Sequence, residues 1–278
     1  MSQTQSLQSR LVKDQIFKVF MMILSSLLMI PLLFILYYIV SRGISVLNWE
    51  FFTQLPKPVG EVGGGVSNAI VGTLMLIFIS AIFSIPLGIF IGMYLSENQK
   101  GKIPELARLC VDTLQGVPSI VMGIIAYAWI VMPLGSFSVL SGGVALALMM
   151  LPLVIKATEE TLKLIPESLK EASFALGVPY YKTMLRVVLP AGKSGIMSGI
   201  LLGLARVSGE TAPLLFTAFG NPFMNVNIFR SSNSLPLLIF NYATSPYQDW
   251  QQLAWGASLL LVLFVLSLSI LAKVVVRK

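Results

Sequence analysis

The sequence predicts an all-helical integral membrane protein with six transmembrane helices and both termini in the cytoplasm. Hydrophobic residues make up 56% of the 278-residue chain and charged residues only 11%, a composition too apolar for a soluble domain of this length. Six runs reach the roughly 20 mostly apolar residues that a spanning helix needs. They cover residues 18–41, 68–95, 113–134, 138–156, 194–219 and 254–276. Few polar residues separate the third and fourth runs, which leaves five spans as the alternative.

The positions of lysine and arginine predict how these helices are oriented. Short loops that keep basic residues remain on the cytoplasmic side. Basic residues are frequent before the first predicted helix, after the second, between the fourth and fifth, and after the sixth, whereas the other loops contain only Arg42, Lys57 and Arg230. Six spans place all the basic segments on one side, and five would not. The net charge of +7 therefore reflects membrane topology, and nucleic-acid binding is not expected.

The chain divides into an N-terminal unit, residues 1–67, and a five-helix core, residues 68–276. The N-terminal unit contains a cytoplasmic segment, the first helix and an outer interfacial loop. Its apolar run is too long for the core of a signal peptide and lacks a small-residue cleavage pattern, so it is expected to remain as a helix. Trp49, Phe51 and Phe52 in the loop are expected to anchor it at the membrane surface, with a partner-binding patch as the alternative.

Small residues recur every four positions on two of the predicted helices and indicate close packing. They are Ser80, Ser84, Gly88 and Gly92 on the second helix, and Gly195, Gly199 and Gly203 on the fifth. At this spacing each series lines one helix face and lets a neighbouring backbone approach. Both helices are therefore expected in the packed interior.

The outer segment between the fifth and sixth predicted helices, residues 220–253, is long and partly apolar. Its apolar run, residues 235–242, is too short to span a bilayer. This run predicts a short interfacial helix or a lid rather than a free linker.

The residue types exclude several kinds of chemistry. The chain has one cysteine, Cys110, and no histidine, so an intrachain disulfide, the usual metal clusters and histidine-based catalytic sites are excluded. Gly192-Lys193-Ser194 imitates the end of a phosphate-binding loop, but Val187 occupies the place of the required glycine and no strand is expected before it. We therefore expect no catalytic residue, no metal and no cofactor bound by this chain.

The cytoplasmic loop at about residues 157–193 carries alternating charges that predict short amphipathic helices. Pro166 suits the first turn of a helix, and Glu167 favours the positive end of its dipole. Gly177 then ends the helix, which predicts one short helix over residues 166–176. A solvated loop whose charges only keep it in water is the alternative.

This loop resembles the EAA loop of the type I ABC importer permeases. The matching residues are Glu171, Ala172, Gly177, Leu189 and Pro190, and the conservative departures are Ser173 and Val187. The resemblance implies the type I ABC importer permease fold. It also implies that the short helix sits in a cleft of a separate ATPase subunit, which uses ATP and Mg and passes its closure into the membrane domain.

Two charged residues, Arg206 and Glu210, lie within the fifth predicted helix. Arg206 is roughly 18 Å along the helix from Ser194, well inside a hydrocarbon core of about 30 Å. An arginine there costs on the order of 3 kcal/mol and should face the protein interior or a water-filled path. Glu210 follows one turn later on the same face and can pair with Arg206.

The chemistry of these residues makes them candidates for a substrate path. Arginine suits an oxyanion, because its planar fork donates paired hydrogen bonds and stays charged. Glu210 either neutralises Arg206 or accepts a proton from a protonated phosphate, and an ion pair that only locks the helix is the alternative. We include Thr211 and Ser119 among the pathway candidates.

The third predicted helix contributes to the same path. Gly116, Pro118 and Ser119 loosen the helix and expose backbone groups, because proline removes a donor. Asp112 is expected near the cytoplasmic entry, as a solvated or loop-paired carboxylate.

Three segments, LQGVPSIVMG, ARVSGETAPLLFTA and LPLLIFNYA, resemble the PstA-type permease subunits of phosphate ABC importers. The resemblance runs from about Gly65 to the C-terminus. It implies a lipid-embedded, non-catalytic subunit of the bacterial plasma (inner) membrane that moves inorganic phosphate by alternating access, with Arg206 implicated in its passage. It also implies a second homologous permease, two ATPase subunits and an extracytoplasmic phosphate-binding protein as partners.

Two alternatives to phosphate import remain open. A related permease for sulfate or molybdate is the nearer one, because arginine alone does not separate these oxyanions. A stand-alone channel or intramembrane enzyme using Arg206 and Glu210 is the other, and the EAA-like loop argues against it.

Overall fold

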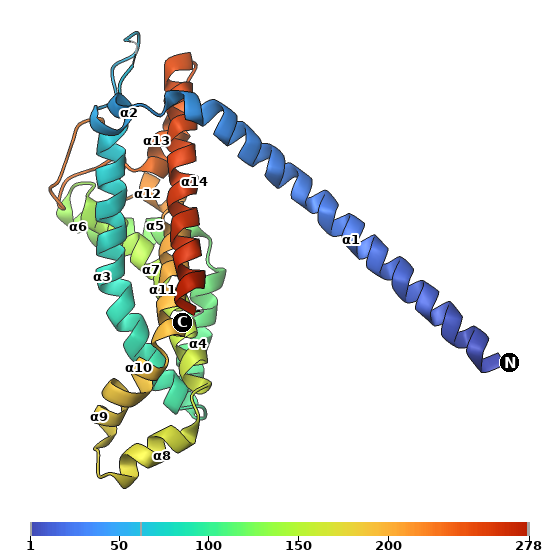
Figure 1. The fold of residues 1–278 in the computed structure, drawn as a ribbon. Helices are drawn as coiled ribbons and strands as arrows, with labels where there is room; N and C mark the ends of the chain where they lie inside the picture. Colours follow the sequence, from blue (N-terminus) through green and yellow to red (C-terminus); the bar gives the residue numbers. More distant parts are fainter. Residues whose placement is uncertain (1, 62, 277–278) are drawn as a thin grey trace.

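The computed structural model describes residues 2–61 and 63–276 of an all-helical chain (Figure 1). Within these residues, four helices are long and apolar enough to cross a membrane, or six if each of two bent helix pairs is one span. The structure is therefore consistent with the predicted six spans, two of which are then bent pairs rather than single helices. The topology prediction also relied on Arg10, Arg277 and Lys278. Arg277, Lys278 and the side chain of Arg10 lie outside the described part of the chain.

Four predicted spans are continuous helices. They are α1 (Ser2–Gly43), α3 (Ser67–Glu97), α7 (Val139–Lys163) and α14 (Gln248–Val276). Ser138 caps the start of α7, because its side chain accepts the backbone N–H of Ser141. Each helix extends beyond the apolar run that predicted it, and polar ends carry the extra turns.

The third predicted span, residues 113–134, is not one helix. It consists of α4 (Lys102–Gly116) and α5 (Ser119–Ala126), which meet at an angle of 106°. The break falls at Val117 and Pro118, where the proline ring disfavours a helical conformation of the residue before it. After α5 the chain passes through a π-helical turn, η2 (Tyr127–Val131), into α6 (Met132–Leu134).

The fifth predicted span, residues 194–219, is also broken. A bent segment of α9 (Tyr180–Thr183), η3 (Met184–Val188) and α10 (Leu189–Ala191) leads at 69° into α11 (Lys193–Val207). The chain then turns and forms the short helix α12 (Ala212–Leu215). A continuous helix to residue 219 was the wrong expectation: α11 ends at Val207 before Gly209, and Pro213 in the first turn of α12 has no N–H with which to continue a helix from the preceding turn.

The N-terminal unit contributes two side chains, Phe51 and Val66, to a core cluster. Between η1 (Ile44–Val46) and α3, the chain forms α2 (Trp49–Thr53), capped by the side chain of Asn48. Trp49 is 81% exposed, whereas Phe51 is 1% exposed and belongs to a core cluster. A shared surface role for the three aromatic residues is therefore wrong for Phe51. The division at residue 67 stays a prediction.

The run at residues 235–242 forms α13 (Leu235–Ala243), which confirms a short helix. It is neither interfacial nor a lid, because Leu237 and Leu238 are fully buried and the helix packs against α14 and α3. The hydroxyl of Thr73 on α3 accepts the backbone N–H of Leu235 at 2.8 Å. This contact fixes the start of α13 inside the bundle.

The small-residue series confirm the predicted packing and identify the shared neighbour, which is α7. A Cβ added to Gly88 of α3 would lie 2.6 Å from Val154 of α7. One added to Gly195 of α11 would lie 2.6 Å from the Thr161 methyl group, also on α7. Both backbones therefore approach α7 too closely for larger side chains, and α7 forms the centre of the bundle.

Candidate functional site

A short exposed helix lies at one end of the bundle. α8 (Glu167–Ala175) agrees with the predicted helix to within one residue at each end, and Figure 1 shows it beside α9, beyond the ends of the long helices. Gly177 has a φ of +74°, a left-handed conformation that glycine adopts without steric cost. The N–H of Val178 donates to the Ser173 carbonyl and closes the helix end.

The surface of α8 combines charge with exposed apolar side chains. Glu171 and Ala172 are exposed, as are Phe174 and Leu176, the last at 83%. Leu164, just before α8, is 84% exposed. Apolar groups exposed together at one end of a molecule mark an interaction surface. We call these five residues the α8 surface.

Ser173 holds α8 against the following segment. It is buried, and its hydroxyl lies 2.9 Å from the hydroxyl of Thr183 on α9, which is fully buried. Buried hydroxyl groups need such partners. Ser173, which the loop pattern would replace with alanine, thus contributes a tie between α8 and α9 rather than a neutral departure.

The last two predicted coupling residues lie apart from the α8 surface. Leu189 and Pro190 belong to α10, where the chain returns to the bundle, and Leu189 packs against the main core cluster. Gly192 follows directly, between α10 and α11, where an added Cβ would lie 2.9 Å from the side chain of Leu162. The structure therefore brings Glu171, Ala172, Ser173 and Gly177 together, and separates Leu189 and Pro190 from them.

An ion pair joins α8 to the end of α3. Lys170 pairs with Glu97, the last residue of α3, and the two side chains are only 16% and 18% exposed. Such partial burial makes the pair less screened by solvent than a surface pair. The position of α8 is therefore linked to the position of a long core helix.

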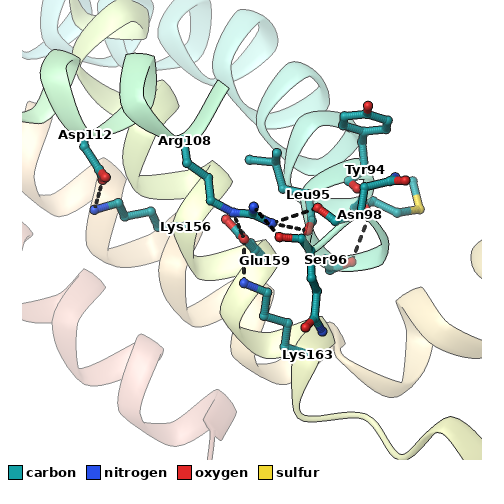
Figure 2. A network of polar contacts seen from close by, with 11 residues as sticks. Tyr94, Leu95, Ser96, Asn98, Arg108, Asp112, Lys156, Glu159 and Lys163 are labelled. Carbon is teal, nitrogen blue, oxygen red and sulfur yellow. Dashed lines mark hydrogen bonds and ion pairs between the residues drawn. The ribbon is translucent and has the colours of Figure 1, made fainter. Parts of the chain in front are cut away.

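A polar cluster that the sequence did not reveal lies at the C-terminal end of α3 (Figure 2). Arg108 of α4 donates from Nε to Glu159 of α7 at 2.8 Å, and Lys163 donates to the same carboxylate oxygen at 2.6 Å. The remaining guanidinium nitrogens donate to carbonyl groups of Leu95, Asn98 and Gln99 at 2.7–3.1 Å. Because the last carbonyl groups of a helix have no partner within the helix, the Arg108 guanidinium stabilises the C-terminal end of α3. The cluster thus joins α3, α4 and α7.

The sequence does contain one signal of this cluster. Glu159 is 6% exposed and occupies the same buried face of α7 as Ile155 and Leu162. A carboxylate in an apolar stripe at helical spacing requires a cationic partner. The sequence could show that need, but not that Arg108 fulfils it.

Asp112, on α4, is exposed and pairs with Lys156 of α7 at 2.6 Å. Figure 2 shows this pair beside the Arg108 cluster. Asp112 is therefore a solvated carboxylate, as expected, and its partner is a helical lysine rather than a loop residue.

Arg206 and Glu210 occupy the break after α11. Arg206 is exposed in the last turn of α11, and Glu210 is half-buried beyond the turn at Ser208 and Gly209. Within the described residues, neither side chain forms a hydrogen bond or ion pair. The expected pairing on one helix face is wrong, because the helix ends at Val207 and takes Glu210 off that face.

The two broken segments meet at a glycine–proline contact. A Cβ on Gly123 of α5 would lie 2.6 Å from the Cα of Pro213 in α12. Ser119 is half-buried one turn before Gly123, and Thr211 is half-buried at the start of α12. The structure therefore places Ser119, Glu210 and Thr211 on two segments that pack against each other.

A bundle of spanning helices, two of them broken, with an exposed short helix at one end has the architecture of an importer permease. Residues 84–278 match the family described as binding-protein-dependent transport system inner membrane component. The chain belongs to this family and is a multi-pass protein of the bacterial inner membrane.

Individual relatives and solved structures agree with the family. The phosphate transport system permease protein PstA of Yersinia pestis is 44% identical over 248 residues, covering 89% of this chain and 84% of the relative. PstA 1 of Mycobacterium tuberculosis H37Rv is 36% identical over 271 residues, 96% and 88% of the two chains. The inward-facing MetNI methionine ABC transporter gives a TM-score of 0.62 at 21% identity, covering 76% of this chain and 94% of that chain. This likeness shows the type I ABC importer permease fold, as the sequence predicted.

Proposed function

We propose that this chain is a permease subunit of an ATP-driven importer that moves inorganic phosphate inward by alternating access. The observation that carries the proposal is its similarity to phosphate permeases, at 44% identity to one over most of both chains. The chain has no catalytic step of its own in this proposal. ATP hydrolysis takes place in a partner subunit.

Arg206 is the proposed phosphate ligand. Its guanidinium is exposed at a helix break, and a guanidinium matches an oxyanion with paired, charge-assisted hydrogen bonds. Because Arg206 has no ion-pair partner among the described residues, no pair must be broken before phosphate binds. The alternative role, an ion pair that only locks the helix, lacks its pair in this conformation.

Glu210, Thr211 and Ser119 are the proposed supporting residues. Glu210 accepts the proton of a protonated phosphate, or neutralises Arg206 when the turn between them closes. The hydroxyl groups of Thr211 and Ser119 donate to the remaining phosphate oxygens. Half-burial of all three residues supports this arrangement, because a desolvated donor or acceptor contributes more than an exposed one.

The α8 surface is the proposed docking site for the ATPase, on the cytoplasmic side. Two ATPase subunits, each using ATP and Mg, bind this chain and a second homologous permease. A phosphate-binding protein docks at the opposite end. The exposed Leu164 and Leu176 support the docking role, because covering an exposed apolar side chain with a partner surface is energetically favourable.

A contiguous series of contacts supports energy transfer from α8 to Arg206. Lys170 ties α8 to α3, and Arg108 ties the end of α3 to α4. α4 continues through the break at Pro118 into α5, which packs on α12 beside the Arg206 segment. Each step is a direct contact or a stretch of continuous chain, so a movement of α8 has a physical route to the Arg206 segment.

Transport by the assembled complex tests the proposal. Arg206→Gln should lower ATP-dependent phosphate uptake at least about tenfold, since one charge-assisted contact is worth about 1.5–3 kcal/mol. Arg42→Gln, which removes another exposed arginine, is the matched control and should transport normally. Uptake by Arg206→Gln at the wild-type rate would refute the role of Arg206. Wild-type uptake that sulfate or molybdate, but not phosphate, competes away would refute the substrate.

A further inference from the structure

A pocket of about 510 Å³, lined by both polar and aromatic side chains, lies beside the outer ends of the two broken segments. Its polar lining comes from Arg230, Ser136, Ser231 and Asn221, and its aromatic lining includes Phe137 and Phe219. Ser136 and Phe137 follow α6, and Phe219 and Asn221 follow α12. In Figure 1, α6 and α12 lie in the half of the bundle away from α8 and α9.

The lining groups favour an anion. Arg230 is exposed and its guanidinium forms no hydrogen bond or ion pair with the described residues, and the same holds for the hydroxyls of Ser136 and Ser231. The residues that line the pocket include no carboxylate. A second pocket, of about 590 Å³, also contains an arginine, Arg42, but sets Glu50 and Asp249 beside it. Of these two pockets, the one that contains Arg230 is the better anion site, because carboxylates repel a bound oxyanion.

The backbone around Arg230 is fixed by the first turn of α7. The N–H of Val139 donates to the Arg230 carbonyl at 3.1 Å, and the N–H of Leu140 donates to the Ile228 carbonyl at 2.9 Å. The side chain of Asn225 donates to the same Arg230 carbonyl at 3.3 Å. These bonds satisfy N–H groups that a helix start leaves free. They also hold Arg230 in place, so that binding an anion orders little backbone.

The aromatic side of the pocket is built around a strained residue. Phe219 has a φ of +64°, which is uncommon for a residue other than glycine and is found preferentially at ligand sites. Its ring stacks on Phe137 with centroids 4.5 Å apart. The stacked rings give this side of the pocket an apolar wall, beside which a guanidinium attracts an anion more strongly than it does in open water.

We propose that this pocket binds an oxyanion at the entrance to the transport path, and that inorganic phosphate occupies it before reaching Arg206. The inference rests on the proposed transport of phosphate. The chain connects the two sites directly, because the segment after Glu210 and Thr211 runs through α12 into Phe219. A phospholipid headgroup carries the same chemistry, so the experiment has to separate the two sources.

Chemical protection tests the site without a substitution. The assembled transporter, purified in maltoside micelles and stripped of phospholipid, is treated with phenylglyoxal, and modification of each exposed arginine is followed by peptide mass spectrometry. Inorganic phosphate at several times its dissociation constant should slow modification of Arg230 at least about threefold relative to chloride at equal ionic strength. Arg42 should react equally in both. Protection of Arg230 by added phospholipid but not by phosphate would overturn the phosphate assignment, and no protection would overturn the site.

Transport by variants tests its function. At saturating phosphate-loaded binding protein, Arg230→Gln should lower uptake about five- to tenfold, and Arg230→Lys should restore part of the loss by retaining the charge. Arg42→Gln is the control and should match the wild type. If Arg230→Gln matches a wild type that imports phosphate, this inference fails and the proposed function stands. If the wild-type complex imports no phosphate, both fail.

Discussion

Reversal of the Lys170–Glu97 ion pair tests whether α8 acts on the membrane domain through α3. Lys170→Glu places two carboxylates next to each other at the end of α3, and Glu97→Lys places two ammonium groups there. Either change removes the attraction that holds α8 and adds repulsion between like charges. The double variant, Lys170→Glu with Glu97→Lys, restores an ion pair of opposite direction.

The expected magnitude follows from how far the pair is buried. Exposed pairs contribute about 0.2–1 kcal/mol, and breaking a buried pair costs about 3–5 kcal/mol. Because the Lys170 and Glu97 side chains are 16% and 18% exposed, we place their coupling energy between these limits, at about 1–2 kcal/mol. That energy corresponds to a change of about five- to thirtyfold in an equilibrium constant.

The assay is phosphate uptake per ATP hydrolysed by the reconstituted complex. Each single reversal should lower this ratio at least about fivefold, with ATP hydrolysis retained, and the double variant should recover most of it. Lys100→Glu reverses an exposed lysine near the same helix end and should leave the ratio unchanged. A normal ratio in both single variants would refute the reasoning. So would a double variant no better than the singles.

Three further substitutions test the packing that supports these sites. Arg108→Ala should lower the melting temperature of the detergent-purified protein by several degrees. Glu159 and three carbonyl groups lose a hydrogen-bond donor, which costs about 2–3 kcal/mol. An unchanged melting temperature would contradict this prediction. Gly88→Ala should cost about 1–3 kcal/mol by overpacking, whereas Gly116→Ala, which meets nothing within 4 Å, should be neutral in the same melting assay. Gly177→Ala should weaken ATPase association in co-purification through about 1 kcal/mol of backbone strain, and Gly177→Asn less; equal losses would exclude strain as the cause.

The features that the sequence predicted well are those that depend on residues close together in the chain. The small residues on α3 and α11 mark buried faces because a four-residue spacing repeats along one side of a helix. The ends of α8 follow from Pro166 and Gly177, whose conformational preferences are intrinsic. None of these inferences requires knowledge of a distant contact.

The breaks in the third and fifth spans could not be placed by the same means. The predicted spans at residues 113–134 and 194–219 each extend through a break, at Val117–Pro118 and between Val207 and Ala212, because mean hydropathy over a long window stays high across a few small or polar residues. At the first break the residues Gly116 and Pro118 indicated loosening but not a bend of 106°. At the second, the contact between Gly123 and Pro213 comes from tertiary packing. The same limit explains why Arg206 and Glu210 were expected to pair.

The central position of α7 suggests how the two ends of the molecule act together. Its first turn donates hydrogen bonds to the loop that carries Arg230, and near its other end Glu159, which also pairs with Lys163, holds Arg108 at the α8 end. At about 1.5 Å per residue, its 25 residues span roughly 37 Å. The glycine faces of α3 and α11 pack against its length, and these contacts support the helix on both sides of Pro152, where the missing N–H weakens the hydrogen-bond ladder. α7 therefore connects the proposed phosphate entrance to the ATPase end by one continuous helix, and Pro152 is the position at which it can bend.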